Sequence, residues 1–205
     1  MIKKKVGIIN YKAGNIYSVK NSFNYLGCET YLLNNIKDFK NIDYIVLPGV
    51  GSYGYCVDSL SKCNYFLDIN KLLVKNRVPC LCICVGMQML GLDSEESLKI
   101  PGLELLDFNV TRIKKKKNFK LPHVGWDDVV FNKNFCFFKK NQKYDFYFDH
   151  SYIVDINKYT LGVTNYGERF SAVLQHKNIL ACQFHPEKSQ ENGLNFLKSF
   201  ISFYA

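Results

Sequence analysis

Short apolar runs alternate with helix-like segments along the first half of the chain. The segment Asn15–Leu26 carries apolar side chains three or four positions apart, which predicts an amphipathic helix, and Gly27 follows where a helix C-cap belongs. Two more helices are predicted over Asp58–Asn76 and Gly86–Leu92. This alternation is typical of a mainly parallel sheet with helices on both faces. The strands expected between the helices are Val6–Ile9, Glu29–Leu33, Tyr44–Leu47 and Val78–Cys84.

The pattern changes in the second half, where short strand-like segments follow one another. They are Leu105–Ile113, Asp128–Val130, Asp145–Phe148, Tyr159–Thr164, Ala172–Gln175 and Ile179–Gln183. A last amphipathic helix is predicted over Gly193–Phe203. Because no repeat, low-complexity segment or linker divides the chain, we expect one α/β domain over residues 1–205. Its predicted architecture is a flavodoxin-like, three-layer sandwich with a mainly parallel central sheet and a β-rich second half.

Composition is that of a soluble globular protein. Hydrophobic residues make up 47% and charged residues 22% of the 205 residues, and no stretch approaches the ~20 apolar residues of a membrane span. Eight cysteines would suggest disulfides in a secreted protein, but the apolar run of a signal peptide is missing after the first lysines. We therefore expect a cytoplasmic protein with reduced thiols, most of them buried as small hydrophobic side chains.

The chain is basic, with a formal net charge of +9. Its basic residues do not interleave with aromatic residues along a recognisable reader motif, so we expect no nucleic-acid partner. The one dense run, Lys114–Lys117, lies between strand-like segments and is interpreted as a solvated hairpin loop. Docking of an acidic partner, or attraction of an anionic substrate, are the alternatives for this run.

The first candidate for chemistry is the segment that runs into Cys84. An apolar strand ends there, Gly86 permits a tight turn, and a helix is expected to follow. This strand–turn–helix pattern is typical of a nucleophile elbow. The helix N-terminus favours the thiolate of Cys84, and the amide of Val85 is placed to donate to an oxyanion.

Two other interpretations fit the same segment. Cys80, Cys82 and Cys84 alternate along one strand and therefore face one side, which suits core packing and also three soft metal ligands. Metal sites more often use pairs of cysteines separated by two residues, so a metal is the weaker alternative. Taken alone, the segment favours simple core packing.

A second segment changes that balance. His185 and Glu187 follow a predicted strand and are two residues apart, so an extended backbone would project both to the same side. Pro186 between them would stiffen this geometry, and the carboxylate would orient the imidazole and stabilise its charged form. A thiol at an elbow with an oriented imidazole predicts a catalytic nucleophile, base and orienting group in Cys84, His185 and Glu187.

A glycine-rich loop after another predicted parallel strand completes the candidate site. The glycines of Pro48–Ser52 let backbone N–H groups approach a ligand closely. Val50 and Gly51 are therefore expected to supply a second oxyanion donor and to hold the α-carboxylate of a substrate. Such a loop is weak support when taken alone.

With these three pieces placed, nearly the whole chain resembles the class I (triad) glutamine amidotransferases, and more narrowly the glutaminase subunits of imidazole glycerol phosphate synthase. Met87-Gln88, Pro122–Trp126 and Lys188-Ser189 separate this subfamily from relatives that serve GMP, anthranilate or carbamoyl phosphate synthesis. The matching stretches are Asn10-Tyr11, Gly14-Asn15, Leu47–Gly51, Cys84–Gln88, Pro122–Trp126, His150–Tyr152 and His185–Ser189.

The resemblance implies the class I glutamine amidotransferase fold and its activity. Cys84 would attack the side-chain amide of glutamine, and Gln88 would help to hold this substrate. His185 would pass a proton to the departing ammonia before water hydrolyses the thioester to glutamate. The amides near Val50-Gly51 and of Val85 would stabilise the tetrahedral oxyanion. No metal and no organic cofactor is implied.

The same resemblance implies a partner and a pathway. Ammonia would pass into a (β/α)8-barrel cyclase subunit, bound as a heterodimer, which forms imidazole glycerol phosphate in histidine biosynthesis. Five residues would belong to the face that meets the cyclase: Asn10, Asn15, Trp126, Tyr152 and Lys188.

Three positions depart from the family pattern. Cys82 stands where glycine is usual, Asp127 where asparagine is usual, and Asp149 where valine is usual. The last two lie on or near the expected partner face, so they bear on partner identity rather than on the chemistry. A paralogue that supplies a surface-sugar amidotransferase through a barrel protein is therefore an alternative. A second alternative is a degenerate, non-catalytic binding module, which the intact triad argues against.

Overall fold

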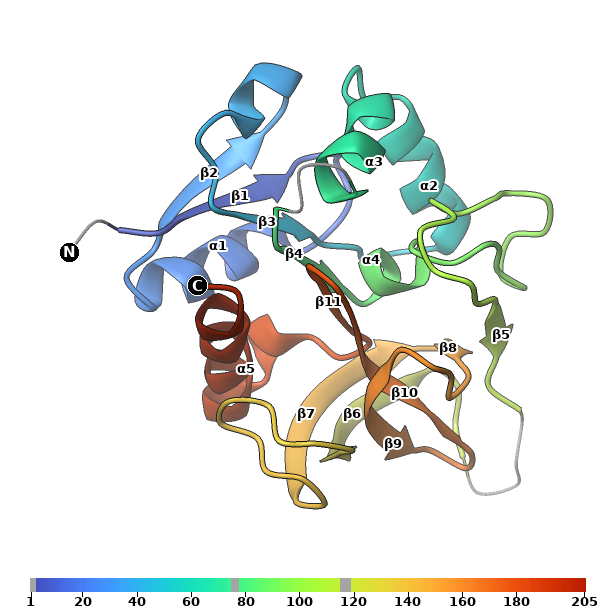
Figure 1. Ribbon diagram of the computed structural model, residues 1–205. Coiled ribbons are helices and arrows are strands. Elements are labelled where there is room, and N and C mark those ends of the chain that lie inside the picture. The colour runs from blue at the N-terminus through green and yellow to red at the C-terminus, as the bar shows by residue number, and fades with distance from the viewer. Residues whose placement is uncertain (1–2, 75–77, 115–118) are drawn as a thin grey trace.

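The computed structural model describes residues 3–74, 78–114 and 119–205 (Figure 1). Its main sheet has nine strands in the order β2-β1-β3-β4-β11-β10-β9-β6-β7. A second, two-stranded sheet joins β5 (Val110–Arg112) to β8 (Tyr152–Val154). Because β4 from the first half pairs with β11 near the C-terminus, both halves of the sequence contribute to one continuous sheet.

The five strands at one end of the main sheet are parallel. They are β1 (Lys5–Ile9), β2 (Glu29–Leu33), β3 (Tyr44–Leu47), β4 (Cys80–Ile83) and β11 (Ile179–Cys182). The last three are buried at every position, as expected where helices cover both faces of a parallel sheet. Since β3, β4 and β11 are neighbours, the loops that leave their carboxyl ends meet at one edge, where ligands bind in open α/β sheets.

The sheet continues into four strands that pair antiparallel to one another. They are β10 (Arg169–His176), β9 (Thr160–Asn165), β6 (His123–Phe131) and β7 (Lys143–His150). Several of the apolar side chains that this half contributes to the core are phenylalanines, and Phe146 stacks on Phe184 with a centroid distance of 3.9 Å. In the β6–β7 pair, His123 lies opposite His150.

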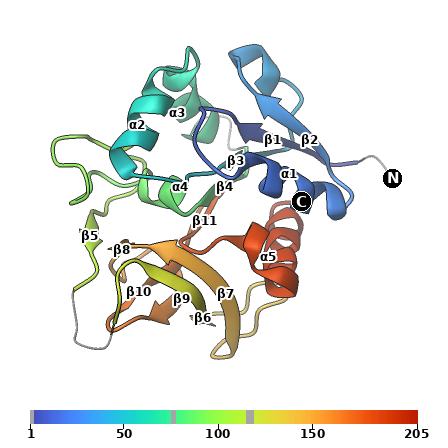
Figure 2. The ribbon, with the colours of Figure 1, turned by 180° about the vertical axis from the view of Figure 1, so that it is seen from behind.

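Helices cover both faces of the parallel strands. Figures 1 and 2 show α1 and α5 on one side of these strands and α2 and α3 on the other. The arrangement confirms the predicted α/β fold with a mainly parallel sheet and a β-rich second half. The helical segments are α1 (Ile16–Tyr25), η1 (Ile36–Phe39), α2 (Tyr53–Ser61), α3 (Phe66–Val74), α4 (Val85–Gln88), η2 (Pro186–Lys188) and α5 (Gln190–Phe203).

The predicted helix over Asp58–Asn76 is wrong as a single element. It is two helices, α2 and α3, and the chain turns between them at residues 62–65. The turn buries the Tyr65 ring against Phe39, with a centroid distance of 5.4 Å, and lets the Tyr65 hydroxyl donate to the Asn10 carbonyl at 3.0 Å. Residues 75–76 of the prediction lie outside the described residues.

Other predicted boundaries also change. The helix after Cys84 ends at Gln88 instead of Leu92, because the following backbone bonds to residues 102–105, as in the 2.7 Å bond from Leu103 N to Met89 O. Of the strand predicted over residues 105–113, only Val110–Arg112 forms a strand, which is β5. Strand β8 and residues 123–127 of β6 were not predicted. Whether each of these segments forms a strand depends on its pairing with a partner strand, and no local sequence pattern indicates that pairing.

Two smaller predictions concern the basic run and membranes. Lys114 is exposed and forms an ion pair with Glu168 at 3.5 Å, while Lys115–Lys117 lie outside the described residues. No helix in the described part of the chain is long and apolar enough to cross a bilayer.

Candidate active site

Cys84 lies at a sharp turn between β4 and α4. Its backbone angles are φ 53° and ψ −112°, a conformation that strains any residue with a Cβ atom. The turn is held by the 2.8 Å bond from the Cys84 amide to the Cys182 carbonyl of β11. Strand, turn and helix are therefore arranged as in a nucleophile elbow, with the thiol 3% exposed at the start of the helix.

The elbow packs directly on the loop that follows β3. A Cβ atom added at Gly86 would lie 2.2 Å from the Leu47 carbonyl oxygen, and one added at Gly49 would lie 2.4 Å from the Gly86 nitrogen. Both positions therefore require glycine, since the atoms that would clash belong to backbone. This contact brings the loop of Val50 and Gly51 to the elbow.

His185 and Glu187 meet, but not by the predicted geometry. His185 Nδ1 lies 2.9 Å from Glu187 Oε1, and the two side chains are 2% and 1% exposed. The backbone between them is not extended: Pro186–Lys188 forms the 3-10 turn η2. The turn, and not strand alternation, brings the carboxylate under the imidazole. Asn15 Nδ2 adds a longer contact of 3.5 Å to the same carboxylate oxygen.

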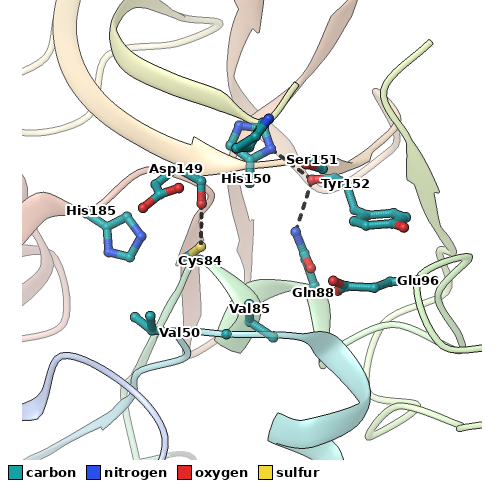
Figure 3. Close-up of a pocket in the computed structure, with 12 residues that line it drawn as sticks. Val50, Cys84, Val85, Gln88, Glu96, Asp149, His150, Ser151, Tyr152 and His185 are labelled. Atoms are coloured by element: carbon teal, nitrogen blue, oxygen red, sulfur yellow. Dashed lines mark hydrogen bonds between the residues drawn. The ribbon is translucent and has the colours of Figure 1, made fainter. Parts of the chain in front are cut away.

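The imidazole of His185 is charged in this environment. Burial lowers its pKa, but the interactions with Cys84 and with the Glu187 carboxylate outweigh burial and raise the pKa to about 10. The arrangement therefore favours the imidazolium form of His185 at neutral pH. Figure 3 shows the ring beside the Cys84 sulfur at one end of a cavity.

The cavity gathers the predicted substrate-binding residues. It has a volume of about 330 Å³, which suits a small ligand. Cys84 and His185 lie at one end, and Gln88, Glu96 and Tyr152 at the other (Figure 3). The residues around it are Val50, Gly51, Cys84, Val85, Gln88, Glu96, Pro122, Asp149, His150, Ser151, Tyr152 and His185.

The side-chain amide of Gln88 is held by two hydrogen bonds that its nitrogen donates. Gln88 Nε2 donates to the Tyr152 carbonyl and to Gln183 Oε1, each at 3.0 Å. Gln183 Nε2 in turn lies 3.6 Å from Cys84 Sγ. The oxygen of the Gln88 amide is thereby left to accept a hydrogen bond from a ligand.

Sequence patterns missed several residues of the cavity. Glu96 contributes a carboxylate, one oxygen of which accepts from the Tyr53 amide at 2.8 Å. It lies in irregular chain after α4, where no periodicity or motif marks it. Asp149, which was predicted to lie on or near the partner face, instead lines the cavity, with its carbonyl oxygen 3.9 Å from Cys84 Sγ. Gln183, which does not line the cavity but contacts Gln88 and Cys84, was predicted only as the end of a strand.

Residues predicted to meet a partner fall into two groups. Trp126 is 48% exposed and packs edge-on against Tyr147, and Lys188 Nζ lies 5.4 Å from the centroid of the same Tyr147 ring. Asn10, whose side chain bonds to Asn34, is half-buried at the end of β1. Asn15 and Tyr152, by contrast, contact the site itself, through Glu187 and Gln88.

The cysteine strand behaves as a packed interior. Cys80 Sγ and Cys82 Sγ lie 3.7 Å apart, and both side chains are inaccessible to solvent, so these two of the three cysteines share a face. Burial raises the pKa of the Cys82 thiol well above its usual value, which opposes the thiolate form that a metal requires. Within the described residues, no three His, Cys, Asp or Glu side chains are placed to hold a metal ion. All eight cysteines are free thiols.

Comparison with known proteins identifies the family of the chain. Residues 7–202 match the family model for "Glutamine amidotransferase class-I". The chain is 38% identical over 198 residues to "Imidazole glycerol phosphate synthase subunit HisH" of Caldanaerobacter subterraneus subsp. tengcongensis, covering 95% of this chain and 96% of that protein. It is 39% identical over 199 residues to the protein of the same name from Methanocaldococcus jannaschii, covering 96% and 98%.

Solved structures share the fold at low sequence identity. "Structure of PurLQS from Thermotoga maritima" contains a chain with a TM-score of 0.76 at 17% identity, with both chains fully covered. A second chain, described as "Crystal structure of glutamine amidotransferase", gives a TM-score of 0.75 at 15% identity and covers 97% of this chain and 98% of that one.

Proposed function

Since the chain belongs to the class-I glutamine amidotransferase family, and within it to the HisH subunits of imidazole glycerol phosphate synthase, we propose that Cys84 hydrolyses glutamine with His185 and Glu187. The observation that carries this assignment is the strained elbow itself. It presents the Cys84 thiol to a cavity that also holds the charged His185 ring.

The proposed reaction has two halves. The Cys84 thiolate attacks the carboxamide carbon of glutamine, and the His185 imidazolium gives its proton to the nitrogen as the C–N bond breaks and ammonia leaves. Neutral His185 then takes a proton from water as the water oxygen attacks the thioester. Glutamate leaves, and the thiolate–imidazolium pair is restored. Glu187 stabilises the charged ring in both halves.

The backbone amides around the elbow suit the tetrahedral oxyanion. The Val85 amide belongs to the first residue of α4, which has no acceptor within its own helix. The Val50-Gly51 loop approaches from β3 and is held there by the Gly49–Gly86 contact. Donors fixed by backbone geometry stabilise developing charge without reorganisation.

The far end of the cavity suits the amino-acid end of glutamine. The Glu96 carboxylate and the Gln88 amide oxygen are both acceptors there, and an α-ammonium group carries three donors. Glutamine bound with its ammonium group at Glu96 places its carboxamide toward Cys84, at the opposite end. Glu96 is accordingly assigned to substrate recognition.

We propose that the ammonia passes to a (β/α)8-barrel cyclase subunit bound as a heterodimer. Trp126 and Lys188, which flank the Tyr147 ring, offer an aromatic and cationic docking surface next to η2. Asn15 contacts Glu187, the residue before Lys188. A partner seated on this surface would lie next to the catalytic pair, as ammonia transfer requires.

The test is glutamine hydrolysis in the presence of the cyclase subunit of the same organism. Cys84→Ala is expected to abolish activity, while Cys136→Ser, which changes an exposed cysteine, is expected to retain it. Loss of the nucleophile typically costs several orders of magnitude in kcat. Wild-type protein that is inactive with this partner, or a Cys84→Ala variant as active as wild type, rejects the assignment.

The pathway is tested separately by complementation of a histidine auxotroph that lacks its glutaminase subunit. Growth supports the histidine-pathway assignment, and its loss with Cys84→Ala ties growth to the chemistry. A tagged chain that captures a barrel protein of surface-sugar synthesis, and fails to complement, favours the paralogue instead.

A further inference from the structure

Two buried histidines lie beside the cavity and have no part in the reaction described above. His123 of β6 and His150 of β7 face each other across the sheet and are 2% and 7% exposed. The His123 ring stacks on Phe148 and on Tyr166, with centroid distances of 4.8 and 3.9 Å. This packing holds the ring in one orientation, so its nitrogens face fixed partners.

Three contacts connect these rings into a chain that ends at the cavity. His150 Nδ1 lies 2.9 Å from the Tyr152 carbonyl oxygen, as Figure 3 shows. His123 Nδ1 lies 3.1 Å from His150 Nε2. At the outer end, His123 Nε2 lies 3.4 Å from Asp127 Oδ2.

The tautomers of both rings follow from the inner end of the chain. A carbonyl oxygen only accepts, so His150 Nδ1 carries a hydrogen. Burial, together with His123, lowers the pKa of His150 to about 3, so this ring is neutral and its Nε2 is an acceptor. His123 Nδ1 must therefore donate to it.

The outer contact is left without a hydrogen. Burial lowers the pKa of His123 to about 4, so this ring also has one hydrogen at neutral pH, and it is used toward His150. The bare His123 Nε2 then faces Asp127, in the longest of the three contacts. The distances thus agree with one hydrogen bond in each of the two shorter contacts: His150 Nδ1 donates to the Tyr152 carbonyl, and His123 Nδ1 donates to His150 Nε2.

The Tyr152 carbonyl is the point where this chain meets the substrate site. It accepts from Gln88 Nε2 at 3.0 Å, so it is already satisfied without His150. A second donor, His150 Nδ1, on the same oxygen restrains the orientation of the carbonyl, since only one orientation accepts from both Gln88 and His150. That orientation, together with the bond from Gln88 Nε2 to Gln183 Oε1, decides where the Gln88 amide points.

We propose that His123 and His150 are positioning residues of the glutamine site, which hold the Tyr152 carbonyl so that it orients Gln88 in the cavity. The proposal rests on the glutaminase function proposed above, which gives Gln88 its ligand. It assigns the pair no proton transfer to substrate.

The tautomers are tested first, on the wild-type chain. Protein labelled with ¹⁵N-histidine has only four rings, and two-bond ¹H–¹⁵N correlation at neutral pH distinguishes protonated from bare ring nitrogens. Spectra of single His→Gln variants assign the signals. We expect hydrogen on Nδ1 and none on Nε2 for both His123 and His150. An Nε2–H tautomer at either ring overturns the chain, whether or not the protein hydrolyses glutamine.

The positioning role is tested by kinetics of the complex with the cyclase subunit. His150→Asn keeps an N–H donor near the place of Nδ1, whereas His150→Leu keeps the bulk and loses the donor. We expect His150→Leu to raise the KM for glutamine about fivefold to tenfold with kcat little changed, the value of one hydrogen bond. His150→Asn is expected to restore KM to within about twofold of wild type.

Equal KM values for the two variants overturn the positioning role, because packing alone would then explain the residue. If His150→Leu fails to fold, the tautomer spectra together with the KM of His150→Asn decide. Absence of glutaminase activity in the wild-type complex would reject the proposed function and leave the tautomer result standing.

Discussion

Cys84 is held in a backbone conformation that few residues other than glycine adopt, and its neighbours explain how. The amide is anchored to β11, and the following turn has room for only a glycine at position 86. Strain of this kind persists only where surrounding structure over-determines it. The proposed nucleophile is therefore kept in place by residues that take no part in the proposed reaction.

We expect Gly86→Ala to destabilise the fold by about 1–3 kcal/mol, the usual cost of overpacking. The added Cβ would lie 2.2 Å from the Leu47 carbonyl oxygen, which is backbone and has no freedom to rotate away. Urea denaturation of the variant and wild type measures the difference. Gly54→Ala is the control, because the three atoms nearest to its Cβ belong to the side chains of Ser97 and Ile100, which can shift, and not to backbone. Equal losses for the two variants would contradict the close approach at the elbow.

At the scale of elements, the second half of the chain positions His185, the proposed catalytic base. The edge strand β7 bonds to the segment after β11: the His185 amide donates to the Tyr147 carbonyl at 2.8 Å, and the Tyr147 amide donates to Ser189 Oγ at 2.9 Å. The Ser189 hydroxyl donates in turn to the His185 carbonyl at 2.6 Å. The edge of the sheet is thereby covered, and His185 is fixed beside β4.

Ser189→Ala is expected to cost about 1–3 kcal/mol of folding free energy, because the part-buried Tyr147 amide loses its acceptor. Chemical denaturation gives the value. Thr164→Val is the matched control: its hydroxyl is also buried but has no hydrogen-bond partner among the described residues, so its removal should be neutral or stabilising. A Ser189→Ala variant no less stable than Thr164→Val would show that this link contributes nothing.

At the scale of the whole molecule, buried histidines make stability depend on pH in opposite directions. The pKa of His185 is raised to about 10, so its contribution is complete below pH 6.5 and is lost as the pH rises toward 10. His123 and His150 have pKa values lowered to about 4 and about 3. Their contribution to stability is complete above pH 6.5 and is lost as the pH falls, because these histidines then bind protons in the unfolded chain but not in the folded one.

We therefore expect the free energy of unfolding to fall on acidification from pH 6.5 to 4, by up to about 1.4 kcal/mol per pH unit for each of the two histidines. Denaturation at a series of pH values measures the slope. In His123→Gln the slope should be shallower, whatever the overall stability of the variant. An unchanged slope would mean that His123 is not held neutral in the folded protein.

The sequence alone predicted the alternation of strands and helices, the elbow at Cys84 and the family, because these rest on local spacing and on short motifs. It placed His185 and Glu187 together, but it attributed their proximity to an extended backbone, whereas the 3-10 turn η2 brings them together. Nothing local predicted Glu96, the β6–β7 contacts around His123, or the role of Tyr152 as a carbonyl rather than a side chain.

Local spacing fixes what a segment can form, since backbone geometry and burial act within a few residues. The active site depends on distances between segments far apart in the chain, as between Cys84 on β4 and His185 after β11. Only the pairing of those strands, with the close approach of Gly49 and Gly86, decides them. The sequence by itself determined which residues can do the chemistry, and tertiary packing decided which side chains and carbonyls surround them.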